Sequence, residues 1–469
     1  MFSTIIGTLS EWMYTYILIV LLIATGLYFS FRTRFVQFRL LGESIRAIRE
    51  PKDTDDKNAI SSFEALMVST ASRVGVGNIA GVSTAICLGG SGSVFWMWLI
   101  ALIGGASAFI ESTLAQIYKK RDKDGSSFGG PAYYIQAGLK NRGLGLLFSF
   151  LLILTYMGGF NMVASFNIVT TFETYDFYNP ATTPVIVGGI LAVLFAVCIF
   201  GGGNRLSKIT GVMVPVMAVI YIAVALIVVL LHINLLPGMF ADIFTNAFDL
   251  SSIMGGFVGS CVMLGIKRGL YSNEAGVGSA PNAAAAASVS HPVKQGLVQM
   301  LSVYIDTIVI CTATAFMLLC SGVAPQESLK GMPYVQAAIS NTLGSFGNLF
   351  VTFSLFCFAF TTLLGNFYYA EANLKYINKK SPGKITLMAF RAAAAVIVFL
   401  GSQMEFGLAW NTADVLMGFM ALMNLPVIVI LAKPALNCLN DYIWQRKAGK
   451  NPVFLAKTIG LKEETDFWN

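Results

Sequence analysis

Charged residues and histidines are scarce in this chain of 469 residues. Asp, Glu, Lys and Arg make up 12% of it, there are two histidines, and 56% of the residues are hydrophobic. Soluble proteins contain about 25% charged and roughly 45–50% apolar residues, so this composition cannot cover a water-soluble surface. Apolar stretches near or above the roughly 18 residues that cross a bilayer recur along the chain. The composition therefore excludes soluble, disordered and collagen-like classes and predicts a polytopic all-α membrane protein.

Motifs for metal binding, disulfides and catalysis are also missing. The seven cysteines have no CxxC or Cys/His spacing, and most lie in or beside apolar segments, which indicates small buried hydrophobes. There is no HExxH, no GxSxG elbow and no Walker loop. Residues 75–81, GVGNIAG, miss GxGxxG by one position and lie in an apolar stretch rather than after a strand. We therefore expect no enzyme and no organic cofactor.

Eleven apolar segments are predicted to span the membrane. The seventh is too long for one helix and contains Gly265, Gly269, Gly276 and Gly278, which predicts two half-helices joined by unwound backbone. The eleven segments are residues 12–31, 63–88, 94–118, 144–172, 184–200, 209–231, 251–290, 292–321, 346–376, 385–401 and 412–431.

The basic residues predict the orientation, because Lys and Arg accumulate in cytoplasmic loops. All but four of the 31 Lys and Arg residues fall in alternate loops or in the C-terminal tail. The N-terminus is thus expected outside and the C-terminus in the cytoplasm. The net charge of +7 becomes a signal of topology, and no nucleic-acid partner is expected. The basic run 32–49 is either an interfacial amphipathic helix or a solvated connector.

Two of the predicted spans contain glycine-rich interruptions. Residues 71–78 read ASRVGVGN, and residues 269–278 read GLYSNEAGVG. Each Gly inside a helix costs about 1 kcal/mol relative to Ala, so these glycines need a reason. One reason is an unwound stretch of the helix, and the alternative is close helix packing through small residues. Without the first segment ten spans remain, and the interrupted ones are the first and sixth. This pattern predicts a 5+5 inverted-repeat transporter with its site at the bilayer midplane.

The predicted organisation has four parts. Residues 1–62 form an extra transmembrane helix and a basic connector, 63–231 the first five-helix repeat, 251–432 the second, and 433–469 a cytoplasmic tail. The breaks free main-chain amides and carbonyls, which lipid would penalise, so these groups must face a ligand, water or protein. Half-helix N-termini suit a carboxylate, and free carbonyls suit a cation. A zwitterionic amino acid with an alkali cation fits both.

Three motifs carry a resemblance to a known family. They are residues 75–81 continuing through FWMW at 95–98, GGPAYYI at 129–135, and GIKRGLYSNEAGVGSAPN at 265–282. Together they resemble the alanine or glycine:cation symporter family, the sodium:alanine symporters, over nearly the whole chain. That family is similar to the leucine-transporter fold. The resemblance implies uptake of a small neutral amino acid, usually alanine or glycine, coupled to sodium and sometimes protons, in a prokaryotic plasma membrane.

The resemblance also implies site residues. The predicted substrate-binding set consists of Ser72, Gly75, Gly77, Asn78, Asn273, Glu274, Gly276 and Asn366. The predicted sodium site combines the hydroxyls of Thr361 and Thr362 with the carbonyls of Ala71, Val74 and Phe358, oxygen ligands that suit a hard cation. Without the resemblance, adjacent threonines more often bond back to their own helical turn.

Two positions depart from the pattern that the family predicts. Ala164 stands where a glutamine is expected, and Asn366 stands where an aromatic residue is common. Both helices are expected to face the substrate, so the choice among alanine, glycine and glutamine stays open.

Acidic residues inside the spans are costly and are functional candidates. Glu274 lies in the second break, where it is either a structural partner of Lys267 and Arg268 or a contact for the substrate amine or a coupling proton. Glu111 and Asp306 are expected to pair with Arg73, Lys267 or Arg268. Asp414 is expected to cap the last span.

The favoured function is a secondary-active symporter that imports a small neutral amino acid with sodium by alternating access. Alternatives are a receptor or sensor that binds an amino acid without moving it, a channel, and a glutamine-preferring or proton-coupled transporter of the same fold. The expected partners are the amino acid, sodium or protons, and membrane lipid. The oligomeric state is open, and a monomer fits the sequence.

Overall fold

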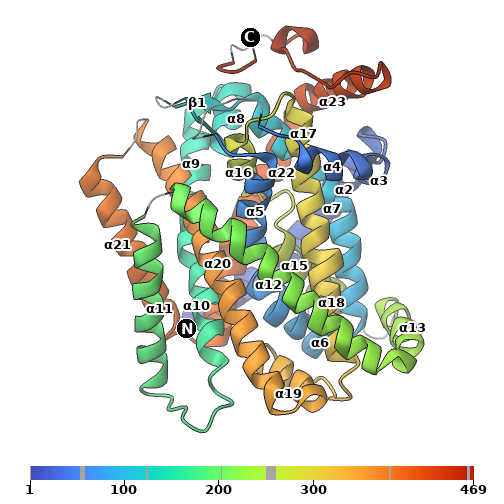
Figure 1. Ribbon diagram of the computed structural model, residues 1–469, viewed down its shortest axis with the longest axis vertical. Helices are drawn as coiled ribbons and strands as arrows, with labels where there is room; N and C mark the ends of the chain where they lie inside the picture. Colours follow the sequence, from blue (N-terminus) through green and yellow to red (C-terminus); the bar gives the residue numbers. More distant parts are fainter. Residues whose placement is uncertain are drawn as a thin grey trace.

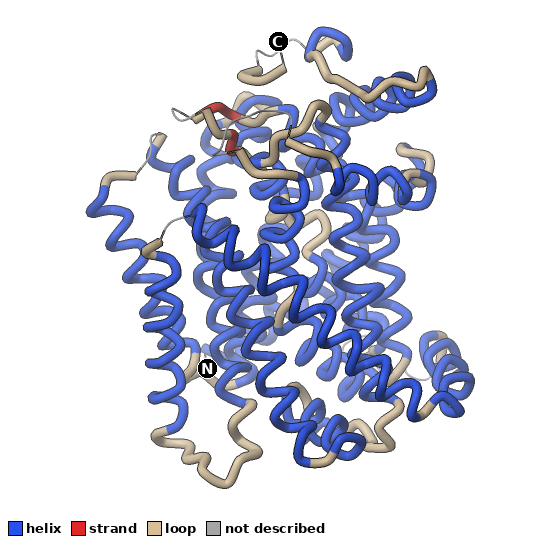
Figure 2. Tube along the Cα trace, viewed as in Figure 1, coloured by secondary structure: helices blue, strands red, loops and turns tan. Residues whose placement is uncertain are grey.

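The computed structural model describes residues 2–52, 59–122, 125–201, 203–249, 260–379, 382–461 and 465–468. The chain forms a bundle of long helices that run mostly along one axis (Figure 1; Figure 2). A small antiparallel sheet at one end pairs β1 (Lys120–Arg121) with β2 (Ser127–Phe128), with Lys120 opposite Phe128. The prediction of an all-α membrane architecture is thus correct in its main feature.

The first half of the chain supplies the following elements. They are α1 (Phe2–Met13), η1 (Tyr14–Leu18), α2 (Ile19–Arg32), α3 (Val36–Arg39), α4 (Leu41–Arg49), α5 (Ser62–Arg73), η2 (Gly77–Gly81), α6 (Val82–Gly89), α7 (Gly92–Ile117), α8 (Pro131–Gly138), α9 (Arg142–Ile153), η3 (Leu154–Phe160), α10 (Asn161–Thr170), α11 (Thr183–Ile199) and α12 (Gly203–Leu231).

The second half of the chain supplies the remaining elements. Its elements are η4 (Ile233–Leu235), α13 (Leu236–Ala247), α15 (Cys261–Asn273), α16 (Pro281–Ala286), α17 (Pro292–Val303), η5 (Tyr304–Cys311), α18 (Thr312–Leu319), η6 (Glu327–Leu329), α19 (Met332–Leu343), α20 (Ser345–Asn378), α21 (Lys384–Gly401), α22 (Phe406–Ile430), α23 (Ala432–Lys447) and η7 (Ala456–Ile459).

Among the described residues, eight continuous helical stretches are long and apolar enough to cross a membrane. A ninth span results if α5 and the η2–α6 stretch, which meet at 51°, are one broken helix. The two remaining predicted spans correspond to α11, an apolar helix of 17 residues, and to the α15–α16 region. The predicted start of that region and of the second repeat, residue 251, lies outside the described residues. Eleven spans and the 5+5 repeat therefore stay predictions.

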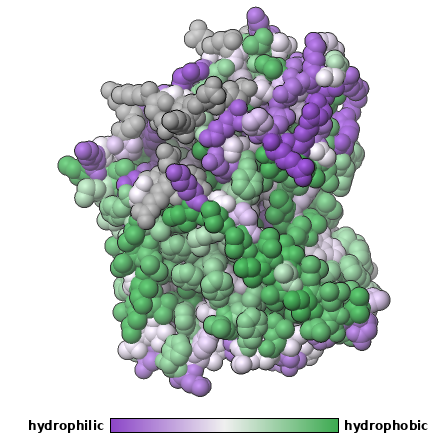
Figure 3. All heavy atoms as spheres, viewed as in Figure 1, coloured by the Kyte–Doolittle hydropathy of each residue, from purple (hydrophilic) through white to green (hydrophobic). Residues whose placement is uncertain are grey.

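On the face drawn in Figure 3, an apolar surface covers the middle of the molecule, and polar residues gather towards its ends. The helices α11, α12 and α21 contribute much of it through exposed side chains such as Val193, Val219 and Val396. Many Ser, Thr and Asn side chains are instead buried inside the bundle. This arrangement, with apolar groups outside and polar groups inside, suits a lipid surround.

The two ends of the bundle differ in what they carry. Helices α4, α8 and α23, the sheet and the C-terminus lie at one end, called the tail end from here on, and α13 and α19 lie at the other (Figure 1). Most of the predicted basic loops map to the tail end. Within the basic run 32–49, α4 buries Ser44 and Ala47 and exposes Leu41 and Ile45.

Helix α7 is the scaffold on which the second broken helix rests. Two of the glycines that predicted unwinding, Gly265 and Gly269, lie within regular α15. A Cβ atom on Gly265 would lie 2.4 Å from the Ser93 carbonyl oxygen, and one on Gly269 would lie 2.7 Å from Ile100. Because only glycine permits this approach, these two residues serve helix packing, and the interruption occupies residues 274–280 alone.

Candidate substrate and cation site

The first broken helix interrupts at Val74. Helix α5 begins with a capping box in which Ser61 and Glu64 satisfy each other's amides, and it ends at Arg73 because Val74 takes an extended conformation (ψ 91°). The chain resumes helical structure at Gly77 in η2. The Asn78 side-chain oxygen accepts a hydrogen bond of 2.8 Å from the Gly75 amide, which stabilises the break.

Glycines let three helices converge at this break. A Cβ atom on Gly75 would lie 2.1 Å from the Thr362 hydroxyl of α20, and one on Gly77 would lie 3.0 Å from Tyr271 of α15. On the opposite side, a Cβ atom on Gly365 would lie 2.8 Å from the Ser72 amide. The absence of side chains at these positions brings α20 and α15 directly against the interrupted backbone.

The second broken helix unwinds over a longer stretch. Helix α15 ends where Glu274 adopts a left-handed conformation (φ 53°), and Gly276 and Gly278 follow at φ 82° and 96°. Glu111 of α7 accepts a hydrogen bond of 3.2 Å from the Gly276 amide, and Asn424 of α22 donates to the Gly276 carbonyl at 2.9 Å. Neighbouring helices thus satisfy the backbone groups that unwinding exposes.

A small cavity lies between the two breaks. Its volume, counted as the space open to the centre of a water molecule, is about 10 Å³, which is about the least that one water molecule requires. The site is therefore closed around one water-sized space. Its walls come from the first break, α10 and its approach, the end of α15, and α20, through Ser72, Arg73, Val76, Gly77, Phe160, Ala164, Tyr271, Glu274 and Thr362.

A hydrogen-bonded chain of polar side chains connects the cavity wall to α20 and α10. The Ser72 hydroxyl donates to the Asn366 side-chain oxygen at 2.7 Å and lies 3.5 Å from the Glu274 carboxylate. Asn366 in turn donates to Asn161 at 3.0 Å, and Ser279 donates to Glu274 at 2.6 Å. Ser72, Glu274 and Asn366 were all predicted site residues, and the fold brings them together from three helices.

Arg73 is a wall residue that the predicted substrate set omitted. It is 2% exposed and donates through Nη1 to the Gln299 carbonyl at 3.2 Å. Its Nε and Nη2 atoms have no hydrogen-bond partner among the described residues. A buried guanidinium with free donors at a cavity is an available anion-binding group. The position of Arg73 beside the first break was the signal that the sequence offered. Which groups Arg73 contacts could be seen only in the packed structure.

Three predicted substrate residues point elsewhere. The Asn78 side-chain amide donates to the Asp306 carboxylate at 2.7 Å, and the main-chain groups of Gly276 form hydrogen bonds with Glu111 and Asn424. The Asn273 oxygen accepts from the Ala275 amide at 3.0 Å, while its own amide nitrogen has no partner among the described residues. None of the three lines the cavity. In this conformation they support the breaks.

Of the two threonines predicted to bind sodium, Thr362 lies against the first break. Thr361 and Thr362 donate to the Phe358 carbonyl at 2.9 and 3.0 Å, the helical back-bonding that is common for threonine. A hydroxyl that donates its proton keeps lone pairs for a cation. Thr362 lies against Gly75, next to Val74, and also lines the cavity. Thr361 instead reaches towards Met217 of α12 at 3.8 Å. The oxygen donor set fits sodium, with Thr362 better placed than Thr361.

The interpretation of Asp414 as a helix cap is wrong. Asp414 lies within α22 and is fully buried. Its Oδ2 atom is 2.9 Å from Lys267 Nζ and 2.6 Å from Arg268 Nη2. Both cations of α15 thus pair with α22, and neither pairs with Glu274.

Glu111 and Asp306 also differ from the expectation that they pair with Arg73, Lys267 or Arg268. Within the described part of the chain, neutral groups satisfy both carboxylates. Glu111 accepts from the Gly276 amide and from Asn424 at 2.8 Å, and Asp306 accepts from Ser272, Thr307 and Asn78. Their role in this structure is to hold the breaks and the adjacent η5 segment together.

Interrupted helices that meet at a closed polar cavity inside an apolar bundle define a membrane transporter of the multi-pass class. The chain belongs to the sodium:alanine symporter family, whose pattern it matches over residues 1–456. It is an amino-acid:sodium symporter and not an enzyme, which confirms the resemblance that the motifs indicated.

Several named relatives cover nearly the whole chain. The "Probable sodium/glutamine symporter GlnT" of Bacillus subtilis is 43% identical over 99% of this chain and 95% of its own length. The amino-acid carrier protein AlsT of the same organism is 43% identical over 100% and 98%. The sodium/alanine symporter AgcS of Methanococcus maripaludis is 37% identical over 92% and 95%.

A solved structure is similar in fold. The Eremococcus coleocola manganese transporter, in complex with an aromatic bis-isothiourea substituted compound, aligns with a TM-score of 0.51 and 14% identity over 89% of this chain and 87% of that one. At this identity the likeness concerns the helix arrangement alone, and it supports a transporter fold.

Proposed function

We propose that the protein imports alanine or glycine together with sodium, by alternating access around the cavity between the two broken helices. The observation that carries this proposal is a single closed cavity whose wall contains both Arg73 and Glu274. A zwitterionic amino acid offers a carboxylate to the first and an ammonium group to the second. Charge-assisted hydrogen bonds of this kind are roughly twice as strong as neutral ones.

The size of the cavity favours a small side chain. Its volume of about 10 Å³ means that even a small amino acid requires the walls to separate. The Phe160 and Tyr271 rings line it and pack against each other at a tilt, with ring centroids 4.6 Å apart, so a larger substrate would have to displace more aromatic surface. Glutamine is the second candidate, because a relative that is 43% identical is named for sodium and glutamine.

Sodium coupling supplies the driving force in this proposal. One elementary charge is worth about 2.3 kcal/mol per 100 mV of membrane potential. Roughly tenfold more sodium outside adds about 1.4 kcal/mol, so accumulation of several hundredfold is attainable. The proposed ion ligands are Thr361, Thr362 and the carbonyls of Ala71, Val74 and Phe358. Proton coupling is the competing possibility within the same fold.

Uptake of labelled alanine by proteoliposomes tests the proposal. An imposed sodium gradient should drive uptake, unlabelled alanine and glycine should compete better than glutamine, and preloaded alanine should support counterflow. Uptake that follows a proton gradient and ignores sodium would contradict the coupling. Saturable binding without counterflow would indicate a receptor, and flux that never saturates would indicate a channel.

A glycine substitution tests the location of the site. Gly77→Leu should abolish alanine binding, because its side chain would enter the cavity beside Tyr271. The matched control is Gly189→Leu in α11, where a Cβ atom meets nothing within 4 Å. Unchanged alanine affinity in Gly77→Leu, with both proteins in the membrane, would move the site elsewhere.

The proposed setting is the plasma membrane of a prokaryote, with the tail end in the cytoplasm and the N-terminus outside. Bacterial and archaeal relatives support the first point, and the basic residues at the tail end support the second. A cysteine replacing Lys330 should react with an impermeant maleimide in whole cells, whereas one replacing Lys457 should react only after permeabilisation. The reverse pattern would invert the topology.

A further inference from the structure

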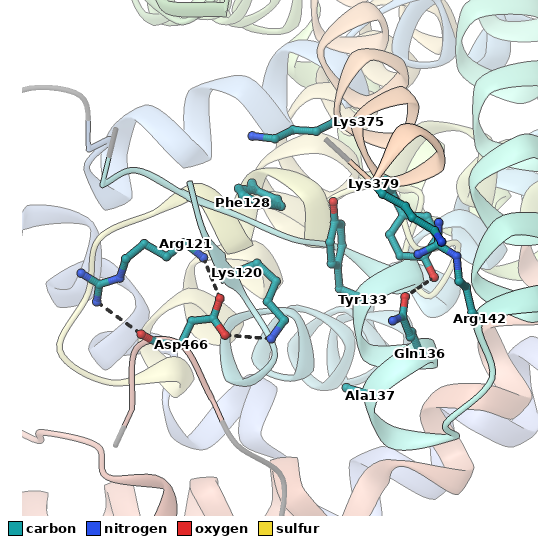
Figure 4. Close-up of a pocket in the computed structure, with 11 residues that line it drawn as sticks. Lys120, Arg121, Phe128, Tyr133, Gln136, Ala137, Arg142, Lys375, Lys379 and Asp466 are labelled. Carbon is teal, nitrogen blue, oxygen red and sulfur yellow. Dashed lines mark hydrogen bonds and ion pairs between the residues drawn. The ribbon is translucent and has the colours of Figure 1, made fainter. Parts of the chain in front are cut away.

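A basic pocket opens at the tail end and shares no lining residue with the substrate cavity. Figure 4 shows this pocket in close-up. Its volume is about 620 Å³, within the range of roughly 300–1,000 Å³ typical of ligand sites. Its walls carry five cations and one acid, namely Lys120 and Arg121 of β1, Arg142 at the start of α9, Lys375 of α20, Lys379 at the C-cap of α20, and Asp466 of the C-terminal segment. This set is called the basic pocket below.

Three of the five cations lack a carboxylate partner within the described ranges. Lys120 pairs with Asp466 at 2.8 Å, and Lys375 pairs with Asp122. The Arg121 guanidinium donates to the Asp466 main-chain carbonyl at 3.3 Å, and Arg142 and Lys379 make no ion pair in this part of the structure. The pocket therefore retains positive charge after its internal pairs are formed.

Aromatic and amide groups hold the pocket in shape. The Arg142 guanidinium lies 5.4 Å from the centre of the Tyr376 ring, and the Tyr376 hydroxyl donates to Gln136 at 2.8 Å. Tyr133 packs edge-on against Tyr376 with ring centroids 4.9 Å apart. Figure 4 draws the Tyr133, Gln136 and Arg142 side chains together on one side of the pocket. A cation fixed in this way loses less freedom when it binds an anion.

The surface next to the pocket is apolar. Helix α9 begins at Arg142 and then exposes Leu144, Leu147 (50%) and Phe150 (54%), and Leu154 at the start of η3 is also exposed. A headgroup in the pocket would thus have apolar surface for its acyl chains within a few turns of the same helix. Basic pockets at the cytoplasmic ends of transmembrane helices are suited to anionic lipid headgroups.

We propose that the basic pocket binds a phosphate-bearing anion, and the adjoining face of α9 favours the headgroup of an anionic phospholipid over free phosphate. Arg142, Lys379 and Lys375 are the main contacts. Asp466 occupies the other side of the pocket, where Lys120 and the Arg121 amide hold its carboxylate (Figure 4). This carboxylate adds a negative charge to the pocket wall and so weakens the attraction of the pocket for an incoming phosphate.

The test uses purified full-length protein in a nonionic detergent and counts bound lipid by native mass spectrometry. Phosphatidylglycerol is titrated against phosphatidylcholine, and inorganic phosphate is titrated separately. Each Lys or Arg near a membrane surface is worth about fivefold in affinity for an anionic lipid, so Arg142→Gln with Lys379→Gln should weaken phosphatidylglycerol binding by about 25-fold. Phosphatidylcholine binding should not change.

Two further variants sharpen the test. Arg49→Gln with Lys433→Gln removes two exposed cations outside the pocket and should leave phosphatidylglycerol affinity within about twofold of the parent protein, because exposed charges at a distance are screened. Asp466→Asn should strengthen phosphatidylglycerol binding several-fold, because it removes the acidic charge from the pocket wall. The C-terminal segment should stay in place, because the Trp468 indole donates to the Gln116 carbonyl at 2.8 Å.

Each outcome bears on the proposal. Pocket-dependent binding of phosphatidylglycerol supports the lipid, and pocket-dependent binding of inorganic phosphate alone supports the site while replacing the ligand. Equal losses in the pocket and control variants, or no loss in either, would overturn the proposal. Because the readout is binding at the tail end, its failure leaves the proposed transport function untouched.

Discussion

Two groups of buried charges in this protein are arranged in opposite ways. In the closed cluster, Lys267, Arg268 and Asp414 form two ion pairs, and the Arg268 guanidinium lies 4.5 Å from the centre of the Trp410 ring. In the cavity pair, Arg73 and Glu274 share a wall but form no ion pair with each other among the described residues. Arg268 has two guanidinium nitrogens without a hydrogen-bond partner, as Arg73 does, so the two groups differ in the carboxylate partner and in the cavity.

This difference separates structural from functional charge. Desolvating an ion costs several kcal/mol, and a charge whose partners are already present contributes mainly to holding helices together. The closed cluster joins α15 to α22, and Lys267 also reaches Ser10 of α1 at 2.8 Å. A buried charge that lines a cavity and has no carboxylate partner is instead available to a ligand, which is why we assign the substrate to the cavity pair.

The largest expected effect is on the stability of the closed cluster. Asp414→Asn leaves two buried cations without a carboxylate, and removing one partner of a buried pair costs about 3–5 kcal/mol. The melting temperature of the purified protein should fall sharply. Glu327→Gln, which breaks the largely exposed pair with Lys330, is the control and should change it little. Equal melting temperatures would mean that Asp414 is not a structural partner.

Arg73→Gln should have the opposite signature. Losing a buried charged contact to the substrate costs about 2–5 kcal/mol, at least about 30-fold in the alanine concentration for half-maximal uptake. The melting temperature should fall less than in Asp414→Asn, because Arg73 forms no ion pair with a carboxylate among the described residues. Arg49→Gln, at an exposed position, is the matched control. A large drop in melting temperature with unchanged affinity would place Arg73 with the closed cluster.

Glu274→Gln removes the negative charge of the cavity pair and keeps an acceptor for Ser279. A hydrogen bond to a charged group contributes about 1.5–3 kcal/mol, so alanine affinity should weaken by roughly 10- to 150-fold. Binding of labelled alanine at saturating sodium measures the change. Glu371→Gln, at an ion pair with Arg391 away from the cavity, should retain parental affinity. An alanine affinity equal to that of the parent protein in Glu274→Gln would mean that Glu274 has a structural role.

The two threonines of α20 should respond unequally. Thr362→Val should raise the sodium concentration for half-maximal uptake by about fivefold, the equivalent of about 1 kcal/mol for one ligand interaction. Thr361→Val should have a smaller effect, because its hydroxyl reaches towards Met217 rather than the break. Alanine affinity at saturating sodium serves as the internal control for both. Equal effects, or effects on alanine alone, would contradict the proposed ion site.

The smallest expected effect concerns the partly exposed ion pair between Glu43 and Arg446 at the tail end. Burial raises the pKa of Glu43, but hydrogen bonds from Arg446 and Tyr442 outweigh it and lower that pKa overall. Because the folded pKa is depressed, the stabilisation is present above the unfolded pKa of about 4.3 and is lost as the pH falls through the folded value.

Acidification below about pH 4 should therefore loosen α23 from α4, and Glu43→Gln should remove this pH dependence. A pair of this exposure is worth at most about 1 kcal/mol, so hydrogen exchange in residues 432–447 is a more sensitive measure than melting. Exchange in α23 that is indifferent to pH in the parent protein would argue against a contribution from Glu43.

Much of the architecture followed from local properties of the chain. Hydropathy located the helices well because lipid forces each segment to satisfy its own backbone bonds. The first break was predicted in place because Gly75 and Gly77 stand within an apolar run. The second was predicted too broadly, since Gly265 and Gly269 serve close packing on α7, and sequence alone does not separate a packing glycine from an unwinding one.

The site was only partly predictable. Ser72, Gly77 and Glu274 line the cavity, whereas Asn78, Asn273 and Gly276 lie in or beside the breaks and face other partners. Whether a side chain in an interrupted helix points to the ligand or supports the interruption depends on the neighbouring helices. The predicted substrate set omitted Arg73 for the same reason, because its place in the cavity wall depends on those helices.

By itself the sequence determined the membrane class, the approximate helix positions, the clustering of basic residues and the family, because hydropathy, glycine placement and motifs are local. Only the tertiary structure decided how the buried charges are partnered. Arg268 and Asp414 are 146 residues apart, yet their atoms meet at 2.6 Å. Such pairing is set by which helix faces pack together, and so the cavity pair, rather than the nearest charges in the chain, defines the proposed site.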